Sequence, residues 1–205
     1  MADTGRTDRL LRSLRLRPTV PDSPALPVTE PEPDRGPART GVTSIVDAGI
    51  YVAGKRIATP ATFDEAFKLL DEHPEGFAWI GLYRPRHSDM ALLAAEFRLS
   101  PLAVEDTITA HQRPKFERYE DVLFLVLRAA QYIDRSETVD FGEVHAFVGD
   151  RFVVTVRHSE TPDLTRIRKE LEATPSVLAK GPSVVLLRLL DGIVDDYTPV
   201  AMGIE

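Results

Sequence analysis

The sequence predicts a mixed, partly antiparallel sheet that is packed by helices, an α/β or α+β fold in one domain. The first observation is the order of hydrophobic periods, because strand-like segments, helix-like segments, further strands and two final helices follow one another. The second is composition, since 205 residues that are 43% hydrophobic and 28% charged suffice for one hydrophobic core. The third is that no apolar stretch reaches the roughly 18 residues of a membrane helix. The best candidate, 184–194, contains Arg188 and Asp191.

The strands of the first half come first. Residues 44–52 and 56–59 flank Ala53-Gly54-Lys55, a short glycine-containing loop that fits a hairpin. The apolar run 77–82 predicts a buried strand.

Three helices are predicted around this strand. Thr62 and Glu65 match a capping box, and apolar residues follow on one helical face as far as the stop at 73–76. Ser88 is predicted to cap a helix that ends at Phe97. Ser100 followed by Pro101 predicts a helix that runs to about Ile108.

The second half changes to a strand period and then returns to helices. Gly149-Asp150 is predicted to be a two-residue hairpin loop. The predicted strands are 122–130, 138–148 and 151–157, and the predicted helices are 164–173 and 183 to about 200. Arg113-Pro114 is expected to end the preceding helix and direct the chain into a strand from Tyr119. Arg113 and Lys115 would then pair with nearby acids such as Glu117 or Asp121.

Residues 1–40 differ in composition from the rest. They hold seven of the sixteen prolines, and seven arginines against six acidic residues. Such a segment buries too little apolar surface to offset its entropy, so we predict a disordered tail over 1–40. Its interleaved arginines and leucines fit either a solvated arm or a short basic amphipathic helix. The globular domain is predicted over 44–182, and 183–205 is predicted to start a further helical region.

Charge and missing motifs exclude several function classes. A net charge of −7 argues against nucleic acid as a partner, because phosphate binding needs a basic face. The chain has no cysteine and no secretory signal, so a cytoplasmic location is the default expectation. Phosphate-binding loops, zinc-protease motifs and nucleophile elbows are missing from the sequence, so we predict no catalytic residues and no enzyme.

What remains is a set of carboxylates on predicted helices. Adjacent Glu105 and Asp106 point about 100° apart on a helix, so they fit either two neighbouring oxygen-ligand sites or a polar helix end. Asp191 and Asp195 are one turn apart, where like charges repel unless a cation lies nearby. Asp191 interrupts an apolar row, so it is either paired or metal-bound in a buried position, or it lies on an exposed flank.

Three further stretches carry a resemblance. Ser-Pro-Leu-Ala-Val-Glu-Asp stands at 100–106, Gln-Arg-Pro-Lys at 112–115, and a strand rich in leucine and valine begins with Tyr-Glu-Asp at 119. This order resembles the CorA family of magnesium and cobalt channels. Trp79-Ile80 and Leu-Asp-Gly-Ile-Val-Asp-Asp-Tyr at 190–197 also resemble the family, so the resemblance covers about 45–200.

The resemblance implies an α/β fold, an αβα sandwich, for the cytoplasmic domain of a homopentamer. The full-length protein would continue into a stalk helix, two membrane helices and a Gly-Met-Asn filter, and it would lie in the cell membrane. It also implies that magnesium, and in some members cobalt, is the ion, and that regulatory magnesium lies between subunits. In that reading Asp106 serves one site, whereas Glu105 and Asp191 belong to a second. Three alternatives stay open: a ZntB-type zinc transporter of the same superfamily, a soluble acid/base enzyme that uses Glu105, Asp106 and His111, and a truncated interaction protein.

Overall fold

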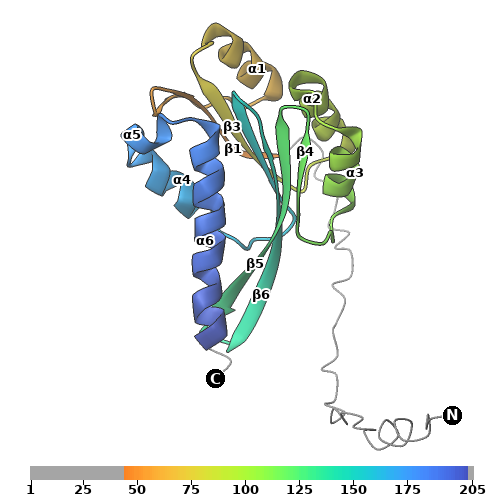
Figure 1. Ribbon diagram of the computed structural model, residues 1–205, viewed down its shortest axis with the longest axis vertical. Helices are drawn as coiled ribbons and strands as arrows, with labels where there is room; N and C mark the ends of the chain where they lie inside the picture. The colour runs from red at the N-terminus through yellow and green to blue at the C-terminus, as the bar shows by residue number, and fades with distance from the viewer. Residues whose placement is uncertain (1–43, 203–205) are drawn as a thin grey trace, which may run out of the picture. The chain divides into compact units, whose positions relative to one another are not determined.

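A computed structural model describes residues 44–202 as a seven-stranded sheet with helices on both faces (Figure 1). The predicted tail over 1–40 lies outside the described residues. The strands are β1 (Ile45–Val52), β2 (Lys55–Ala58), β3 (Phe77–Tyr83), β4 (Lys115–Tyr119), β5 (Val122–Ile133), β6 (Thr138–Val148) and β7 (Phe152–Arg157). The helices are α1 (Phe63–Glu72), α2 (His87–Phe97), α3 (Pro101–Thr109), α4 (Leu164–Glu172), α5 (Pro175–Leu178) and α6 (Pro182–Met202).

The sheet is mixed, as predicted. Its strand order is β2-β1-β3-β7-β6-β5-β4. Only β3 and β7 run parallel among the paired strands of the described region, from Ala78 opposite Phe152 to Tyr83 opposite Arg157. All other pairs are antiparallel, so two antiparallel halves meet along one central parallel contact.

Each face of the sheet has its own hydrophobic core. Helices α1, α2 and α3 cover one face, where Met90, Leu93 and Phe124 are fully buried. Helices α4, α5 and α6 cover the other, where Leu125 packs with Leu189. Figure 1 shows α6 along one side of the sheet and α3 along the other. The sheet therefore separates the side chains of α3 from those of α6, and the αβα prediction is confirmed.

The start of α1 follows the predicted pattern, whereas that of α2 does not. The Thr62 hydroxyl accepts a hydrogen bond from the Glu65 N–H (3.2 Å). The Glu65 carboxylate reaches back to the N–H of Ala61, one residue further than a capping box requires. Our placement of the α2 cap at Ser88 is wrong, because the helix begins at His87 and Arg86 is its N-cap.

Helix α3 ends within one residue of the predicted Ile108, but Arg113-Pro114 is not what ends it. The helix ends at Thr109, and Ala110 (φ 54°) and His111 (φ 59°) are both left-handed, so the chain reverses before Pro114 is reached. Residues 115–119 then form β4, an edge strand that we did not predict, paired antiparallel with β5. Its five residues include three charged ones, so its hydrophobic alternation was too weak to read.

The helices and strands of the C-terminal half agree closely with the prediction. Gly149 donates its N–H to the Phe152 carbonyl (3.0 Å), so the tight loop consists of Asp150 and Arg151, one residue later than predicted. The short helix α5 was not predicted. Across the described residues, every helix is too short or too polar to cross a bilayer.

Candidate functional site

Helix α3 carries two of the three predicted metal ligands. Its buried face consists of Ala103, Val104 and Thr107, which pack against the sheet. Because each residue turns the helix by about 100°, Glu105 points to solvent and Asp106 lies beside the buried face. The Asp106 side chain keeps 25% of its surface exposed. The two adjacent carboxylates therefore have different surroundings.

Asp106 already holds a cation from its own chain. The reversal after α3 brings Lys115 back against the helix, where its Nζ lies 2.6 Å from Asp106 Oδ2. The same ammonium lies 3.1 Å from Glu117 Oε2. The predicted pairing of Lys115 with Glu117 is thus confirmed, whereas Asp121 lies 4.0 Å from Arg118. Hydrogen bonding to Asp106 raises the pKa of Lys115, so the ammonium stays charged.

A buried polar cluster beneath α3 fixes the helix to the sheet. The Thr107 hydroxyl donates to the Ala103 carbonyl (2.8 Å), so it accepts from His145 Nδ1 at 3.0 Å. His145 Nε2 lies 2.5 Å from Glu143 Oε1, and the ring is fully buried. His158 Nε2 donates to the Thr107 carbonyl (2.8 Å). Strand β6 and the residue that follows β7 thereby hold the turn of α3 that carries Asp106.

The pKa values of Glu143 and His158 in this cluster depend on burial and on the neighbouring charged groups. Burial alone would raise the pKa of Glu143, but hydrogen bonding from His145 lowers it, helped by Arg128 at 3.3 Å. Burial lowers the pKa of His158, and the neighbouring His145 adds to that shift. Glu143 is therefore ionised and His158 neutral around neutral pH.

The third predicted ligand lies on the other side of the sheet. Asp191 is exposed on α6 and pairs with Arg188, whose guanidinium also lies 2.6 Å from Glu170 Oε2. The exposed-flank reading of Asp191 is therefore confirmed. Since α3 and α6 cover opposite faces, a single chain does not bring Asp191 to Glu105 or Asp106.

The acid/base alternative depends on Glu105, Asp106 and His111. His111 is exposed on the reversal after α3, like Glu105 on the helix itself. Within residues 44–202, three or more His, Asp or Glu side chains are nowhere close enough to hold one metal ion.

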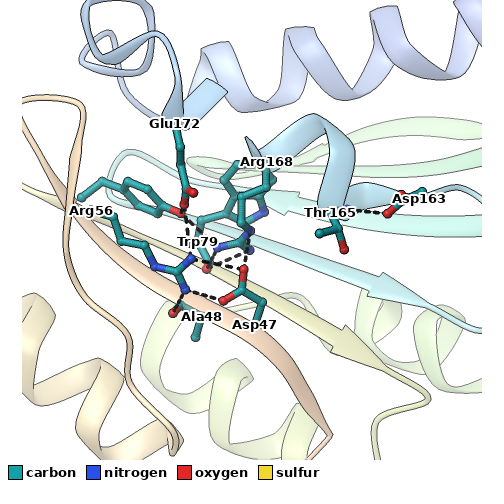
Figure 2. A network of polar contacts seen from close by, with 9 residues as sticks. Asp47, Ala48, Arg56, Trp79, Asp163, Thr165, Arg168 and Glu172 are labelled. Atoms are coloured by element: carbon teal, nitrogen blue, oxygen red, sulfur yellow. Dashed lines mark hydrogen bonds and ion pairs between the residues drawn. The ribbon is translucent and has the colours of Figure 1, made fainter. Parts of the chain in front are cut away.

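A charged cluster between β1, β2, β3 and α4 was missed by the sequence reading (Figure 2). Arg168 donates to the Trp79 carbonyl at 3.2 Å, and its Nε lies 3.1 Å from Asp47 Oδ2. Arg56 bridges Asp47 to Glu172, whose Oε1 lies 3.3 Å from Arg56 Nη1. The sequence did contain a signal for this cluster, because Arg168 occupies a buried position on the otherwise apolar face of α4.

Tyr51 and Trp79 complete this cluster from the sheet. Tyr51 donates its hydroxyl to Glu172 (2.6 Å), and burial raises the pKa of its phenol, so the proton stays in place. The Arg168 guanidinium lies 4.1 Å from the Trp79 ring centroid. The adjoining cavity of about 30 Å³ has room for one or two water molecules. The cluster therefore serves to pack α4 on the sheet.

Comparison with known proteins gives the family. The model of the CorA-like Mg2+ transporter protein family matches residues 74–205. The putative metal ion transporter YfjQ of Bacillus subtilis is 37% identical over 135 residues, which are 65% of this chain and 41% of the relative. The cobalt/magnesium transport protein CorA of Thermotoga maritima is 26% identical over 58% of this chain and 34% of its own length. The chain thus spans well under half the length of these relatives.

The fold is shared with a solved structure. The soluble domain of CorA from Methanocaldococcus jannaschii superposes with a TM-score of 0.56 at 16% identity, covering 77% of this chain and 59% of that one. Because the family model matches most of the globular part, from just before β3 to the last residue, the chain belongs to the CorA-like Mg2+ transporter family.

Proposed function

We propose that this chain is the regulatory domain of a CorA-type divalent cation channel. In this proposal it lies on the cytoplasmic side of the cell membrane, within a homopentamer, and senses internal magnesium through Glu105, Asp106 and Asp191 at subunit contacts. The observation that carries the proposal is the separation of the two ligands assigned to one site: Glu105 lies on α3 and Asp191 on α6, and these helices cover opposite faces of one sheet. They can serve a shared or neighbouring ion only between two copies of the chain.

The donor chemistry fits magnesium. Carboxylate oxygens are the ligands that magnesium prefers, and one or two of them suffice because the ion keeps several of its waters. Glu105 and Asp191 are exposed and Asp106 is half-buried, so all three are accessible to a hydrated ion. Lys115 shows that the Asp106 carboxylate accepts a cation at its surface.

The regulatory effect follows from differential binding. An ion held between two subunits favours the closed contact, whereas carboxylates without an ion repel each other. A hundredfold preference for the closed contact would contribute about 2.7 kcal/mol per saturated site. Equal sites in a symmetric ring would multiply that preference.

The test is a current measurement on the full-length protein while internal magnesium is stepped through the millimolar range. Asp106→Asn and Asp191→Asn, alone and together, should make the current less sensitive to magnesium without abolishing conduction. Asp71→Asn, which alters an exposed carboxylate on α1, is the matched control and should respond like the parent protein. An unchanged magnesium response in the double variant would refute the sensing role. Zinc and cobalt currents recorded in parallel distinguish the zinc-transporter alternative.

A further inference from the structure

Lys115 places an ammonium on the carboxylate that we assign to the metal. Its Nζ lies 2.6 Å from Asp106 Oδ2, while its backbone is fixed in the β4–β5 ladder opposite Val126. We propose that Lys115 is a built-in competitor that lowers the affinity of Asp106 for a divalent cation. This inference rests on the proposed function, because it concerns the regulation of the same site.

The ammonium is held in place from several sides. Glu117 accepts from it at 3.1 Å, and the Phe124 ring centroid lies 5.5 Å from Nζ. The Tyr119 hydroxyl donates to the same Glu117 oxygen (2.9 Å) and fixes that carboxylate. Only 28% of the Lys115 side chain is exposed. Lys115 is therefore an ordered ligand of Asp106 rather than a freely moving surface lysine.

An ion that binds Asp106 must either displace this ammonium or tolerate it a few ångströms away. Both outcomes weaken metal binding, the first by the lost ion pair and the second by charge repulsion. Glu117 offers a second carboxylate to which the displaced ammonium can turn. The pair Asp106 and Glu117 thus gives Lys115 one position that competes with the metal and one that does not.

This arrangement predicts opposite effects for two substitutions. Lys115→Gln removes the competitor and should strengthen magnesium binding about fivefold, the equivalent of about 1 kcal/mol for a partly exposed ion pair. Glu117→Gln removes the alternative partner, so Lys115 should stay on Asp106 and magnesium binding should weaken. If Glu117 acts through Lys115, Glu117→Gln should have a much smaller effect in the Lys115→Gln background.

The experiment digests the full-length protein with thermolysin at a series of magnesium concentrations. The measured quantity is the magnesium concentration that gives half-maximal protection. Lys115→Gln should lower that concentration and Lys115→Arg, which keeps the charge, should not. Arg118→Gln removes a positive charge three residues further along β4, where the side chain is 68% exposed. This control should change the half-maximal magnesium concentration little. Near-ultraviolet circular dichroism checks that each variant is folded.

The outcomes separate this inference from the proposed function. If Asp106→Asn removes the protection but Lys115→Gln leaves the half-maximal concentration unchanged, Lys115 does not compete and the inference fails while the sensing role stands. If Asp106→Asn leaves the protection intact, the sensing role itself fails. Should Lys115→Gln not fold, Glu117→Gln decides alone, and unchanged or tighter magnesium binding in that variant overturns the inference.

Discussion

Arg168 is the buried cation on which the packing of α4 depends, and its replacement gives a sharp test. In Arg168→Met the apolar stem can still pack on the Trp79 ring, but the polar contacts with three partners are lost. These are the ion pair with Asp47 (3.1 Å) and the hydrogen bonds to the Trp79 carbonyl (3.2 Å) and the Tyr51 hydroxyl (3.1 Å). The Arg168 side chain is only 6% exposed, so bulk water has little access to the partner groups that the substitution leaves behind.

The magnitude follows from what each partner retains. Removing one member of a buried ion pair typically costs about 3–5 kcal/mol. Asp47 keeps Arg56 as a partner and 35% of its side-chain surface, which reduces that cost. We therefore expect the free energy of unfolding to fall by about 3 kcal/mol, or about 1.5 M in the urea midpoint for a typical slope of about 2 kcal/mol per molar.

The matched control is Arg166→Met on the same helix. Arg166 is 44% exposed and pairs with Glu170 and Asp196 at the surface, so its loss should cost less than about 1 kcal/mol. Urea denaturation followed by circular dichroism measures both variants. If Arg168→Met and Arg166→Met destabilise the protein equally, the buried cluster does not stabilise α4 and the reasoning fails.

Two further predictions concern the sheet. The folded-state pKa of Glu143 lies below its ordinary value of 4.5, so its contribution to stability is present above that value and is lost as the pH falls through the folded-state pKa. Urea midpoints below about pH 4.5 should therefore fall less steeply in Glu143→Gln than in the parent; equal slopes would contradict the assignment. In Gly142→Ala the added Cβ would lie 1.8 Å from the Thr161 carbonyl oxygen, so the main chain must move. We expect the free energy of unfolding, measured by thermal denaturation, to fall by about 1–3 kcal/mol or more. A melting temperature like that of the parent would show that the 158–163 loop moves aside without cost.

Local signals in the sequence were enough to predict most of the fold. Hydrophobic alternation placed β6 at its observed bounds, and Ser100 followed by Pro101 marked the start of α3. Edge strand β4 escaped because a strand with one exposed edge needs few apolar residues, and 115–119 has only Phe116 and Tyr119. The end of α3 was predicted to within a residue, but its cause was wrong, because Ala110 and His111, both at positive φ, reverse the chain without glycine or proline.

The candidate site was only partly accessible to the sequence. Family resemblance supplied Glu105, Asp106 and Asp191, but the pairing of Asp106 with Lys115 depends on how tightly the chain reverses, which no local pattern encodes. The cluster around Arg168 joins residues more than 100 positions apart, such as Tyr51 and Glu172. Such contacts arise from the sheet order, so a reading of single segments cannot find them.

The single parallel contact between β3 and β7 has a consequence for how the domain forms. Neighbouring antiparallel strands such as β5 and β6 are joined by short turns, so their pairing closes only small loops. Joining Tyr83 to Arg157 instead closes a loop of more than 70 residues, a far larger entropic cost before any contact is gained. The two antiparallel halves can therefore form early as separate units, and pairing β3 with β7 is the step at which they become one cooperative unit.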